Sequence, residues 1–509
     1  MGVLPGGSRE SPTPTFCTTQ VSSAFNNSVV SDETPRSRVT IPYTQLGEFL
    51  QDFEEKHDLL HLTIDGWSFW PIFRLPLGFA LSGLNSPAKE RMGRAKMLRM
   101  VGRDLPTFIN PPFADLVVLT LNSARTEQVG RHFKDIFFDD LLVGRDGFVK
   151  IEELENRAFL SQSRKALVPS LLSTVPFRFF STLLSKVGWF PAHLGSIANR
   201  ISQLIRSELG LSEYTNKVVR LRLARFYLEK RFYRVFLARV RPRTFLHIGC
   251  HFYEALAAAK ELGIRTVEFQ HGFVDRKTHF GYSWGRYAAE YKRRMPVPDQ
   301  FFLYGDYWRD ELAADGFWGD SLRVVGSLRM DDYRLRRDAG DKGPGAPTVL
   351  WTSDGVEVDK AADFMARVLE ELGPEHPVRL AVKLHPHSEN RKEPYFNAFH
   401  RDPRVEIFLG SEAPSTFELL TRAHLHVSIA STCHYEAIGL GVPTVILPLA
   451  SHEKVLALRR SGYAFLTHQP SDLAALIRQW KTLAIPNGVG EIFFRSNALE
   501  NIRQELGLI

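Results

Sequence analysis

The stretch that decides the fold is AHLHVSIASTCHYEAIGLGVPTVILP, residues 423–448. An apolar segment at 425–429 leads through small polar residues into a helical pattern at 433–440. A Gly-Val-Pro turn ends that helix and precedes a second apolar segment at 444–447. This succession predicts one βαβ unit, the element from which doubly wound parallel sheets are built.

The turn of this unit carries Ser431 and Thr432, and Glu436 follows one helical turn later. The end of the strand and the first turn of the helix present free backbone N–H groups, which suit a phosphate. The simpler interpretation is that the two hydroxyls only cap the helix. Glu436 favours a nucleotide site, because its carboxylate can hydrogen-bond a ribose diol while the turn holds the phosphates. We therefore predict Ser431, Thr432 and Glu436 as nucleotide ligands.

The pattern Ser-x-x-Ser-Thr-x-x-x-Glu-Ala-x-x-x-Gly-x-Pro at 428–443 resembles the donor-nucleotide segment of the two-Rossmann-domain (GT-B) glycosyltransferases. Many members that use UDP- or GDP-sugars carry a second Glu eight positions earlier, where this chain has Ser428. Serine-rich versions resemble the bacterial sialic-acid, polysialic-acid and Kdo transferases, which take CMP-sugars, and the CDP-glycerol transferases of teichoic-acid synthesis. The resemblance implies a nucleotide-sugar co-substrate, with CMP- and CDP-linked donors as candidates, and leaves the nucleobase of the donor open.

Length and composition set the class of protein. The chain has 509 residues, 44% of them hydrophobic, which is enough for two ordinary globular domains. Its net charge of +7 permits anionic partners such as nucleic acid, nucleotide sugars or a lipid surface, without choosing among them. The three cysteines are far apart and form no CxxC pair, which argues against a disulfide framework or a cysteine zinc site and favours a reducing cytoplasm.

Two stretches bear on targeting. Residues 1–38 are rich in Ser, Thr, Pro and Gly, which predicts a disordered tail, and they lack the apolar core of a signal peptide. The longest apolar run, 67–84, is interrupted by Pro71, Arg74 and Pro76. A spanning helix needs about 20 cleaner residues, so no transmembrane segment is predicted.

The first clear buried strand is DLVVLTL at 115–121, and Arg125 lies just beyond its carboxyl end. Ligands of open α/β sheets bind beyond such ends, so Arg125 is a candidate contact for an anionic group on an acceptor. The alternative is a salt bridge to Asp135, Asp139 or Asp140 in the acidic segment that follows.

Residues 151–243 are predicted to be mostly helical. Within them, 217–243 holds ten basic residues against one acid, Glu229. Two interpretations stay open: a basic amphipathic helix at the interface of an anionic membrane, or a core helix with a solvated basic face. The apolar stripe on which both depend is Leu221, Ala224, Leu228, Phe232 and Val235.

Beyond this helical region the βαβ pattern returns, with strands predicted at 244–248 and 266–269. The second strand ends in Gln-His-Gly, and His271 at a strand's carboxyl end suits a general base near neutral pH. The alternative is a histidine that only hydrogen-bonds within a loop. Gln-His-Gly with the later His279 and Gly-Tyr282 resembles bacterial surface-polysaccharide synthesis proteins. This resemblance implies a catalytic role for His271 and places His279 and Tyr282 on the acceptor side.

The linker between the domains is predicted at 336–347, which is charged and then rich in Gly and Pro. Past it, a strand at 348–352 precedes Asp354, and a strand at 378–384 closes in His385-Pro-His. The His-Pro pair resembles the HP motif of the polysialyltransferases and CDP-glycerol transferases, which implies that His385 binds or protonates the donor's leaving phosphate. Those sialyltransferases also carry an acid-acid-Gly motif whose carboxylate is the base. Only Asp354-Gly matches it here, and Asp354 is the alternative base.

The histidines around the central βαβ unit raise the alternative of a metal site. His424 and His426 alternate onto one face of a strand and His434 is near, yet no carboxylate has ligand spacing with them. Structural histidines are the favoured interpretation. No Asp-x-Asp stands near a donor strand, so we predict a transfer without metal or cofactor, in which basic residues and helix dipoles hold the phosphates.

The sequence thus predicts an α/β protein with two Rossmann-like domains facing across a cleft (GT-B). The predicted parts are a tail at 1–38, an N-terminal acceptor domain at 39–335 with a helical, basic insertion at 151–243, a linker at 336–347, a C-terminal nucleotide-donor domain at 348–490 and a helix at 491–509 that packs back onto the first domain.

The resemblance, which covers residues 240–509 and only loosely the rest, implies a glycosyltransferase of bacterial surface-polysaccharide assembly. Its partners would be a nucleotide-sugar donor and a polysaccharide or lipid-linked acceptor, with no nucleic acid. The protein would be cytoplasmic, and peripheral on the inner face of the plasma membrane if the basic helix is interfacial. Two alternatives stay open: a CDP-glycerol-type polyol-phosphate transferase, and a non-catalytic glycan- or nucleotide-binding assembly factor.

Overall fold

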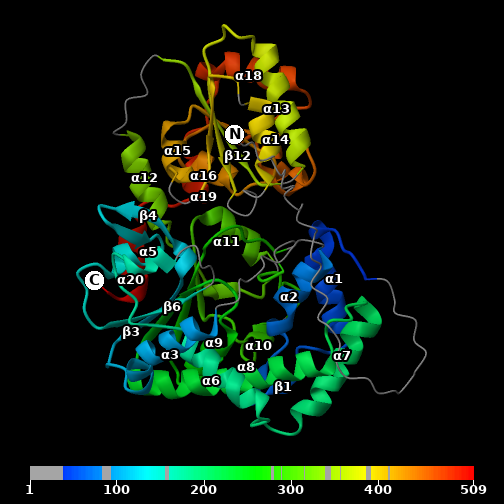
Figure 1. Cartoon of the computed structure of the whole chain (residues 1–509), viewed down its shortest axis with the longest axis vertical. Coiled ribbons are helices and arrows are strands. Elements are labelled where there is room, and N and C mark those ends of the chain that lie inside the picture. The colour runs from blue at the N-terminus through cyan, green and yellow to red at the C-terminus, as the bar shows by residue number, and fades with distance from the viewer. Residues whose placement is uncertain are drawn as a thin grey trace, which may run out of the picture.

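Two parallel sheets, one above the other in Figure 1, form the framework of the protein. The structure is a computed structural model. The residues that it describes are 38–82, 93–154, 160–276, 280–287, 289–314, 316–338, 345–355, 357–385, 391–399, 401–410 and 413–508.

The N-terminal sheet has seven parallel strands in the order β11-β10-β9-β8-β3-β6-β7. In chain order its strands are β3 (Leu116–Leu121), β6 (Phe148–Glu153), β7 (Leu172–Ser173), β8 (Thr244–Ile248), β9 (Arg265–Phe269), β10 (Gln300–Leu303) and β11 (Leu322–Val324). Every residue of β3 is buried, as expected for a strand covered on both faces. The chain reverses its direction of winding between β3 and β8, which makes that point the topological switch of this sheet.

The C-terminal sheet has six parallel strands in the order β14-β13-β12-β15-β16-β17. In chain order its strands are β12 (Thr348–Ser353), β13 (Arg379–Leu384), β14 (Val405–Phe408), β15 (Leu425–Ser428), β16 (Thr444–Ile446) and β17 (Phe465–Leu466). The predicted βαβ unit is confirmed as β15, α16 (Cys433–Gly439) and β16. The switch point of this sheet lies between β12 and β15.

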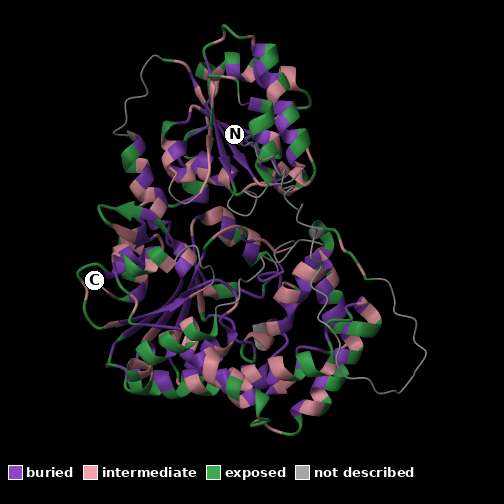
Figure 2. Ribbon diagram, in the orientation of Figure 1, coloured by how far each residue is buried: buried purple, intermediate pink, exposed green. Residues whose placement is uncertain are grey.

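Helices cover both sheets, and in Figure 2 the strands are largely buried while the outer sides of the helices are exposed. The N-terminal helices are α1 (Tyr43–Lys56), α2 (Pro71–Leu81), α3 (Arg94–Ile109), α4 (Asp139–Leu142), α5 (Leu160–Arg164), α6 (Val175–Lys186), α7 (Leu194–Leu209), α8 (Asn216–Val240), α9 (Tyr253–Glu261), α10 (Ala289–Lys292), α11 (Asp306–Ala313) and α12 (Leu328–Asp338). The others are α13 (Val358–Leu372), α14 (Glu393–Phe399), α15 (Thr416–Arg422), α17 (Leu456–Arg460), α18 (Pro470–Arg478), α19 (Val489–Phe493) and α20 (Ala498–Leu506). Two short antiparallel hairpins, β1 (Thr63–Ile64) with β2 (Trp67–Ser68) and β4 (Arg125–Val129) with β5 (His132–Asp135), complete the fold.

The region predicted as a helical insertion is part of the winding of the N-terminal domain. It contains the edge strand β7, and α8 is the crossover helix that leads to β8. The apolar stripe predicted on α8 is wrong in part, because Val235 is exposed. Helix α8 packs against α6, α7 and α9 together, which buries a wider and shifted face. That face includes Val219, Leu223, Phe226, Tyr233, Leu237 and Val240.

The two domains are joined by α12 and by the C-terminal segment. Helix α12 extends into the predicted linker, and Arg337 donates hydrogen bonds to three carbonyls at the end of α15. Helix α19 packs on both α16 and α11, and α20 adds Ala498, Ile502 and Leu506 to the core of the N-terminal domain. A Cβ on Gly305 would lie 2.3 Å from the carbonyl oxygen of Ile492, so only glycine allows this crossing.

The predicted fold class, two Rossmann-like domains facing across a cleft, is confirmed by the two sheets and by the cleft described below. Among the described residues, no helix is long and apolar enough to cross a bilayer.

Candidate active site

The carboxyl ends of β12, β13 and β15 open into a cleft of about 520 Å³ between the domains. All the nucleotide-side residues singled out in the sequence line it: Asp354 after β12, His385 after β13, and Ser431, Thr432 and Glu436 after β15. The opposite wall belongs to the N-terminal domain. Its residues are Arg125, Thr126, Phe133, Ile136, Gln162 and Arg329.

The turn after β15 is held by hydrogen bonds that leave Thr432 open. The Ser431 hydroxyl accepts from the Cys433 N–H at 3.2 Å, so the capping interpretation applies to this serine. Thr432 is exposed at the start of α16, and its side chain makes no capping bond. The Ser428 hydroxyl donates to the Thr352 carbonyl at 2.6 Å and ties β15 to β12 at the switch point.

Asp354 bridges the same two strands. Its Oδ2 accepts from the N–H of Ala430 at 3.1 Å, which fixes the carboxylate beside the turn. His385 is exposed at the end of the neighbouring strand. Lys383, two residues earlier on that strand, also lines the cleft, and its Nζ donates to the Gly410 carbonyl at 3.1 Å. The sequence analysis did not select Lys383, although its position at a strand's carboxyl end was available as a signal.

Glu436 interacts electrostatically with Arg329 of the N-terminal domain. Burial raises the pKa of its carboxyl above the ordinary value, and the charge of Arg329 opposes that rise. Arg329, on α12, donates to Glu127 at 2.5 Å, and its guanidinium lies 4.0 Å from the centre of the Phe417 ring. These contacts hold a positive charge at the domain boundary. The sequence analysis missed Arg329, because nothing local distinguishes it from the other arginines of α12.

His271 lies in a smaller hollow of about 70 Å³ next to the cleft. The two share Ile136, Arg329 and Glu436 among their lining residues. Gln270 locks the turn, because its side chain accepts from the Tyr304 N–H and donates to the Gly272 carbonyl, both at 2.8 Å. The structure thus brings His271 and the nucleotide-side residues to neighbouring hollows.

A second histidine, His251, accompanies His271. Gly249 has a φ of +82°, and a Cβ there would lie 3.0 Å from the His251 ring and 3.9 Å from the His271 ring. Glycine therefore lets both imidazoles pack over the backbone at the end of β8. Beneath them, burial lowers the pKa of His247 to about 3 and keeps that ring neutral. Sequence analysis missed His251, although it follows a strand end as His271 does.

Arg125 lines the cleft, but its guanidinium is already bound to carboxylates of its own domain. Its guanidinium is buried and donates to Glu152 at 2.7 Å, with Asp139 at 3.6 Å. The alternative, a salt bridge to the acidic segment, describes it better. The physical reason is that the cost of burying a guanidinium is offset only by close carboxylates, and these also keep the charge from a ligand.

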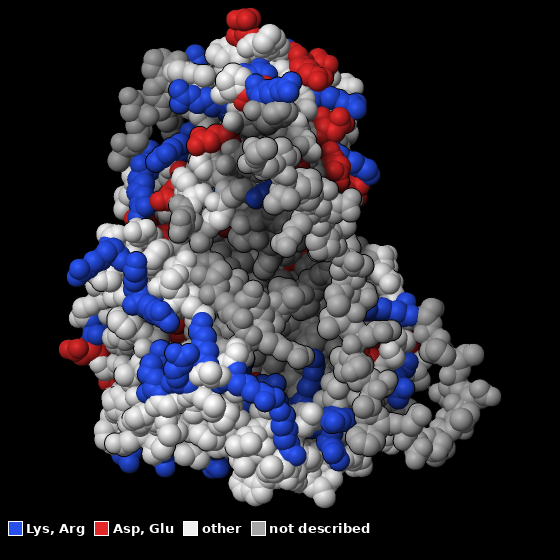
Figure 3. Space-filling view, viewed as in Figure 1, with Lys and Arg blue, Asp and Glu red and all other residues white. Residues whose placement is uncertain are grey.

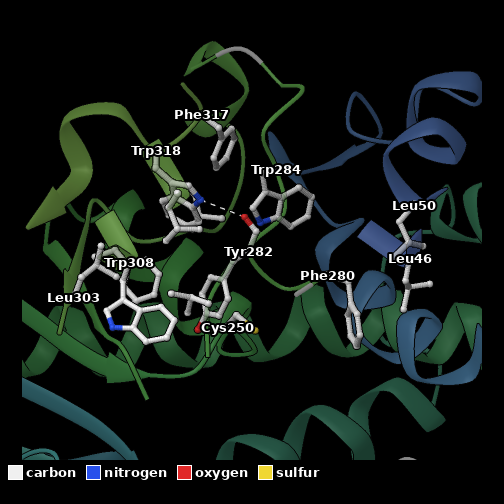
Figure 4. Close-up of a cluster of buried hydrophobic side chains, with 14 of the residues drawn as sticks. Leu46, Leu50, Cys250, Phe280, Tyr282, Trp284, Leu303, Trp308, Phe317 and Trp318 are labelled. Atoms are coloured by element: carbon white, nitrogen blue, oxygen red, sulfur yellow. Dashed lines mark hydrogen bonds between the residues drawn. The ribbon is translucent and has the colours of Figure 1, made fainter. Parts of the chain in front are cut away.

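The prediction that Tyr282 contacts an acceptor is wrong. Its side chain is buried in the aromatic cluster of Figure 4 and its hydroxyl donates to Glu268, so it is closed to an acceptor. Its carbonyl accepts from the Trp318 indole at 3.2 Å, the dashed line in that figure. His279, the other predicted acceptor residue, lies outside the described residues.

The histidines of the central unit act as structural groups. His426 bonds Thr352 through Nε2 at 2.8 Å and Thr444 through Nδ1 at 2.7 Å. His434 bonds the same Thr444 hydroxyl at 2.6 Å. In the part of the chain that the structure describes, no group of three or more His, Cys, Asp or Glu side chains is arranged to hold a metal ion.

Comparison with solved structures finds proteins of similar architecture. The UDP-GlcNAc 2-epimerase of Neisseria meningitidis, solved with UDP-GlcNAc, is 14% identical over 77% of this chain and 98% of its own, with a TM-score of 0.46. MurG of Acinetobacter baumannii is 11% identical over 78% and 100%, with a TM-score of 0.43. CalG4, the calicheamicin glycosyltransferase, is 12% identical over 77% and 93%, with a TM-score of 0.42. No protein-family model and no curated protein sequence matches the chain.

Proposed function

We propose that the protein is a glycosyltransferase that moves a sugar from a nucleotide-sugar donor to a growing surface polysaccharide or a lipid-linked acceptor. The observation that carries the proposal is the meeting of Asp354, His385, Ser431, Thr432 and Glu436 at the switch point of one sheet, in a cleft walled by the other domain. Ligands of doubly wound sheets bind at such points. The protein would act in the cytoplasm, at the inner face of the plasma membrane.

The cleft offers each part of a nucleotide a fitting group. Ser431 and Thr432 would donate to the phosphate, and Glu436 would accept from the ribose hydroxyls. His385 would hold the phosphate oxygen that leaves the sugar. Lys383 and Arg329, which line the cleft, supply positive charge for this step without a metal ion. We propose a CMP- or CDP-linked donor, because Ser428 stands where many UDP- and GDP-sugar enzymes carry a second Glu.

The reaction then needs a base on the acceptor side. The acceptor hydroxyl would lose its proton to His271 or Asp354 as its oxygen attacks the anomeric carbon. The bond from that carbon to the phosphate oxygen breaks, and the nucleotide leaves with the electron pair. His271 is the first choice, because it comes from the domain that faces the donor site and lies beside Glu436.

A thermal-shift panel of CMP, CDP, UDP, GDP and their sugar conjugates tests the donor site. A nucleotide at 100 times its dissociation constant should stabilise the protein by about 2.7 kcal/mol. Glu436→Ala should weaken the affinity of that nucleotide by about 1–3 kcal/mol, the cost of charge-assisted hydrogen bonds. Glu370→Ala, at an exposed position on α13 and outside the cleft, is the matched control and should change nothing.

A transfer assay with the sugar conjugate of the best nucleotide tests the chemistry. Activity should persist in EDTA, because the cations of the cleft are side chains. Loss on chelation with recovery in Mg²⁺ or Mn²⁺ would contradict the metal-independent transfer. Transfer of a polyol phosphate would favour the CDP-glycerol type, and nucleotide binding without any turnover would favour the assembly factor.

A further inference from the structure

The side of the N-terminal domain that faces away from the C-terminal domain is formed by α3, α6 and α8 (Figure 1). Large apolar side chains are exposed to solvent on this side of the domain. Val187 is 70% exposed and Trp189 is 65% exposed, both just past the end of α6. With Leu183 on α6, which is also exposed, they form what we call the apolar face. Contiguous exposed apolar surface marks interaction sites, whereas isolated exposed apolar residues are normal on a soluble protein.

A groove of about 310 Å³ runs between α3 and α6 at the apolar face. Met97 lines it from α3, and Phe179 and Leu183 line it from α6. Phe179, Leu183 and Val187 follow one another at four-residue spacing, so they lie along one side of the helix. The side chain of Lys186 lies at the same groove. The lining is therefore largely apolar, with the ion pair of Arg178 and Glu153 and the cation of Lys186.

The orientation of α6 is fixed by the opposite side of the helix. The Phe177 ring stacks on Tyr233 of α8, with centroids 4.0 Å apart and planes 10° apart. Phe108 of α3 meets the Phe177 ring edge-on at 4.9 Å. Because these contacts hold the three helices together, the apolar face points outward as a consequence of core packing.

The charge around the groove selects the kind of partner. Helices α3 and α6 carry six basic residues, of which Arg103 pairs with Asp104 and Arg178 pairs with Glu153. Lys and Arg gather on the lower part of the molecule in Figure 3. The basic residues of the two helices are Arg94, Lys96, Arg99, Arg103, Arg178 and Lys186. Apolar side chains within a basic surround complement the acyl chains and anionic headgroups of a bilayer.

Helix α8 also carries basic residues, and several of them form ion pairs. Lys230 and Arg231 pair with Asp65, and Arg234 pairs with Glu261. Helix α8 is a crossover helix, and its Arg231 and Arg234, which are 54% and 58% exposed, add to the basic charge of its neighbours.

We infer that the apolar face and the groove between α3 and α6 are a docking surface for an anionic lipid bilayer, with the groove taking apolar acyl chain. The inference does not depend on the chemistry of the cleft, which lies between the domains. Docking would hold the N-terminal domain against the membrane and leave the C-terminal domain on the cytoplasmic side.

Sedimentation of the full chain with vesicles tests this docking. The protein should pellet with mixed phosphatidylglycerol and phosphatidylcholine vesicles more than with phosphatidylcholine alone, and less as salt rises. Val187→Asp with Trp189→Asp should lower the partition coefficient by about tenfold or more, since burial of these side chains is lost. Leu335→Asp is the matched control, because Leu335 on α12 is 72% exposed, and it should pellet as wild type.

A second pair of variants tests the charge. Lys186→Glu should reduce pelleting with the anionic vesicles, whereas Lys481→Glu, at an exposed position of the C-terminal domain, should not. Equal pelleting of wild type with both vesicle types, pelleting with neither, or equal effects of the paired variants would overturn the inference. Hydrogen exchange with anionic vesicles should protect α3 and α6, and protection confined to α8 would overturn it as well.

Two further measurements separate this inference from its rivals. If the apolar face instead binds a second copy of the chain, light scattering will show a dimer that Val187→Asp dissociates, and the inference fails. Nucleotide affinity should be unchanged in the docking variants. Loss of vesicle binding in a protein that still binds nucleotide therefore concerns this surface alone, and the reverse result concerns the proposed function alone.

Discussion

The carboxyl edges of the two sheets have the same topology, but their polar side chains are arranged differently. Each sheet reverses its winding at a switch point where polar residues follow the strands. In the C-terminal domain these residues face the cleft. In the N-terminal domain, Arg125, Asp135 and Asp139 after β3 are turned into the protein, where they bond Lys150 and Glu152 of β6. The topology thus makes a site available, and the local packing decides whether the side chains are left for a ligand.

The buried network of the N-terminal edge explains the difference. Lys150 contacts Asp135 at 2.8 Å and Asp139 at 2.5 Å, and all three side chains are inaccessible to solvent. Arg125 adds its contacts to Glu152 and Asp139. Burial raises the pKa of Asp139 despite its partner Lys150, whereas Asp135 keeps a lowered pKa because Lys150 and Arg125 outweigh its burial. The same edge also carries His251 and His271, whose rings pack over Gly249.

The largest effect is expected from breaking this network. Lys150→Ala leaves two buried carboxylates without their main partner, and should lower the free energy of unfolding by about 3–5 kcal/mol. Urea denaturation measures the loss. Lys360→Ala is the matched control, because Lys360 pairs with Glu357 on the surface of the other domain and is 70% exposed. Similar losses of unfolding free energy in the two variants would show that the charges of the N-terminal edge are no more buried than those on the surface of the C-terminal domain.

An effect of similar size, which develops only as pH rises, concerns Glu268, on β9 three residues before His271. Burial raises the pKa of its carboxyl to about 8, against an ordinary value of 4.5. Its contribution to stability is therefore complete below pH 4.5 and is lost as pH rises towards 8. Glu268→Gln has no such charge to bury. Relative to that variant, wild type should lose about 1.4 kcal/mol per pH unit across this window.

Denaturation of both proteins at several pH values between 5 and 8 checks the slope. Glu370→Gln, at an exposed position, should follow wild type at every pH. A difference between wild type and Glu268→Gln that stays constant with pH would show that Glu268 titrates normally, and the N-terminal edge would then be more solvated than the structure has it.

The fold was predictable because its signals are local. The strands β3, β12, β15 and β16 are short apolar runs between polar turns, and the helix α16 is bounded by a Ser-Thr turn and a glycine. The nucleotide-side residues followed from the same pattern. These residues follow the ends of adjacent parallel strands. The local sequence pattern of each strand was therefore enough to predict that they lie together.

The acceptor side was not predictable in the same way. Whether Arg125 faces a ligand depends on Glu152, and whether Tyr282 is accessible depends on Glu268 and the aromatic cluster around it. These partners are distant in sequence, and no local sequence pattern predicts the contacts with them. Arg329 was missed for the same reason, since its importance comes from Glu436 in the other domain. The buried side of α8 differs from the predicted apolar stripe because a helix with three packing partners has no single apolar side.

In the proposed function, the carboxyl edge of the C-terminal sheet binds the nucleotide and the carboxyl edge of the N-terminal sheet provides the base. Calorimetric titration of His385→Ala and His271→Ala with the nucleotide selected by thermal shift, beside a turnover assay, tests it most directly. His385→Ala should weaken nucleotide binding about tenfold or more, and His271→Ala should bind nearly as wild type but lose turnover. If turnover survives in His271→Ala and is lost in Asp354→Ala, the base is Asp354. Loss of nucleotide binding in His271→Ala with normal binding in His385→Ala would contradict the claim.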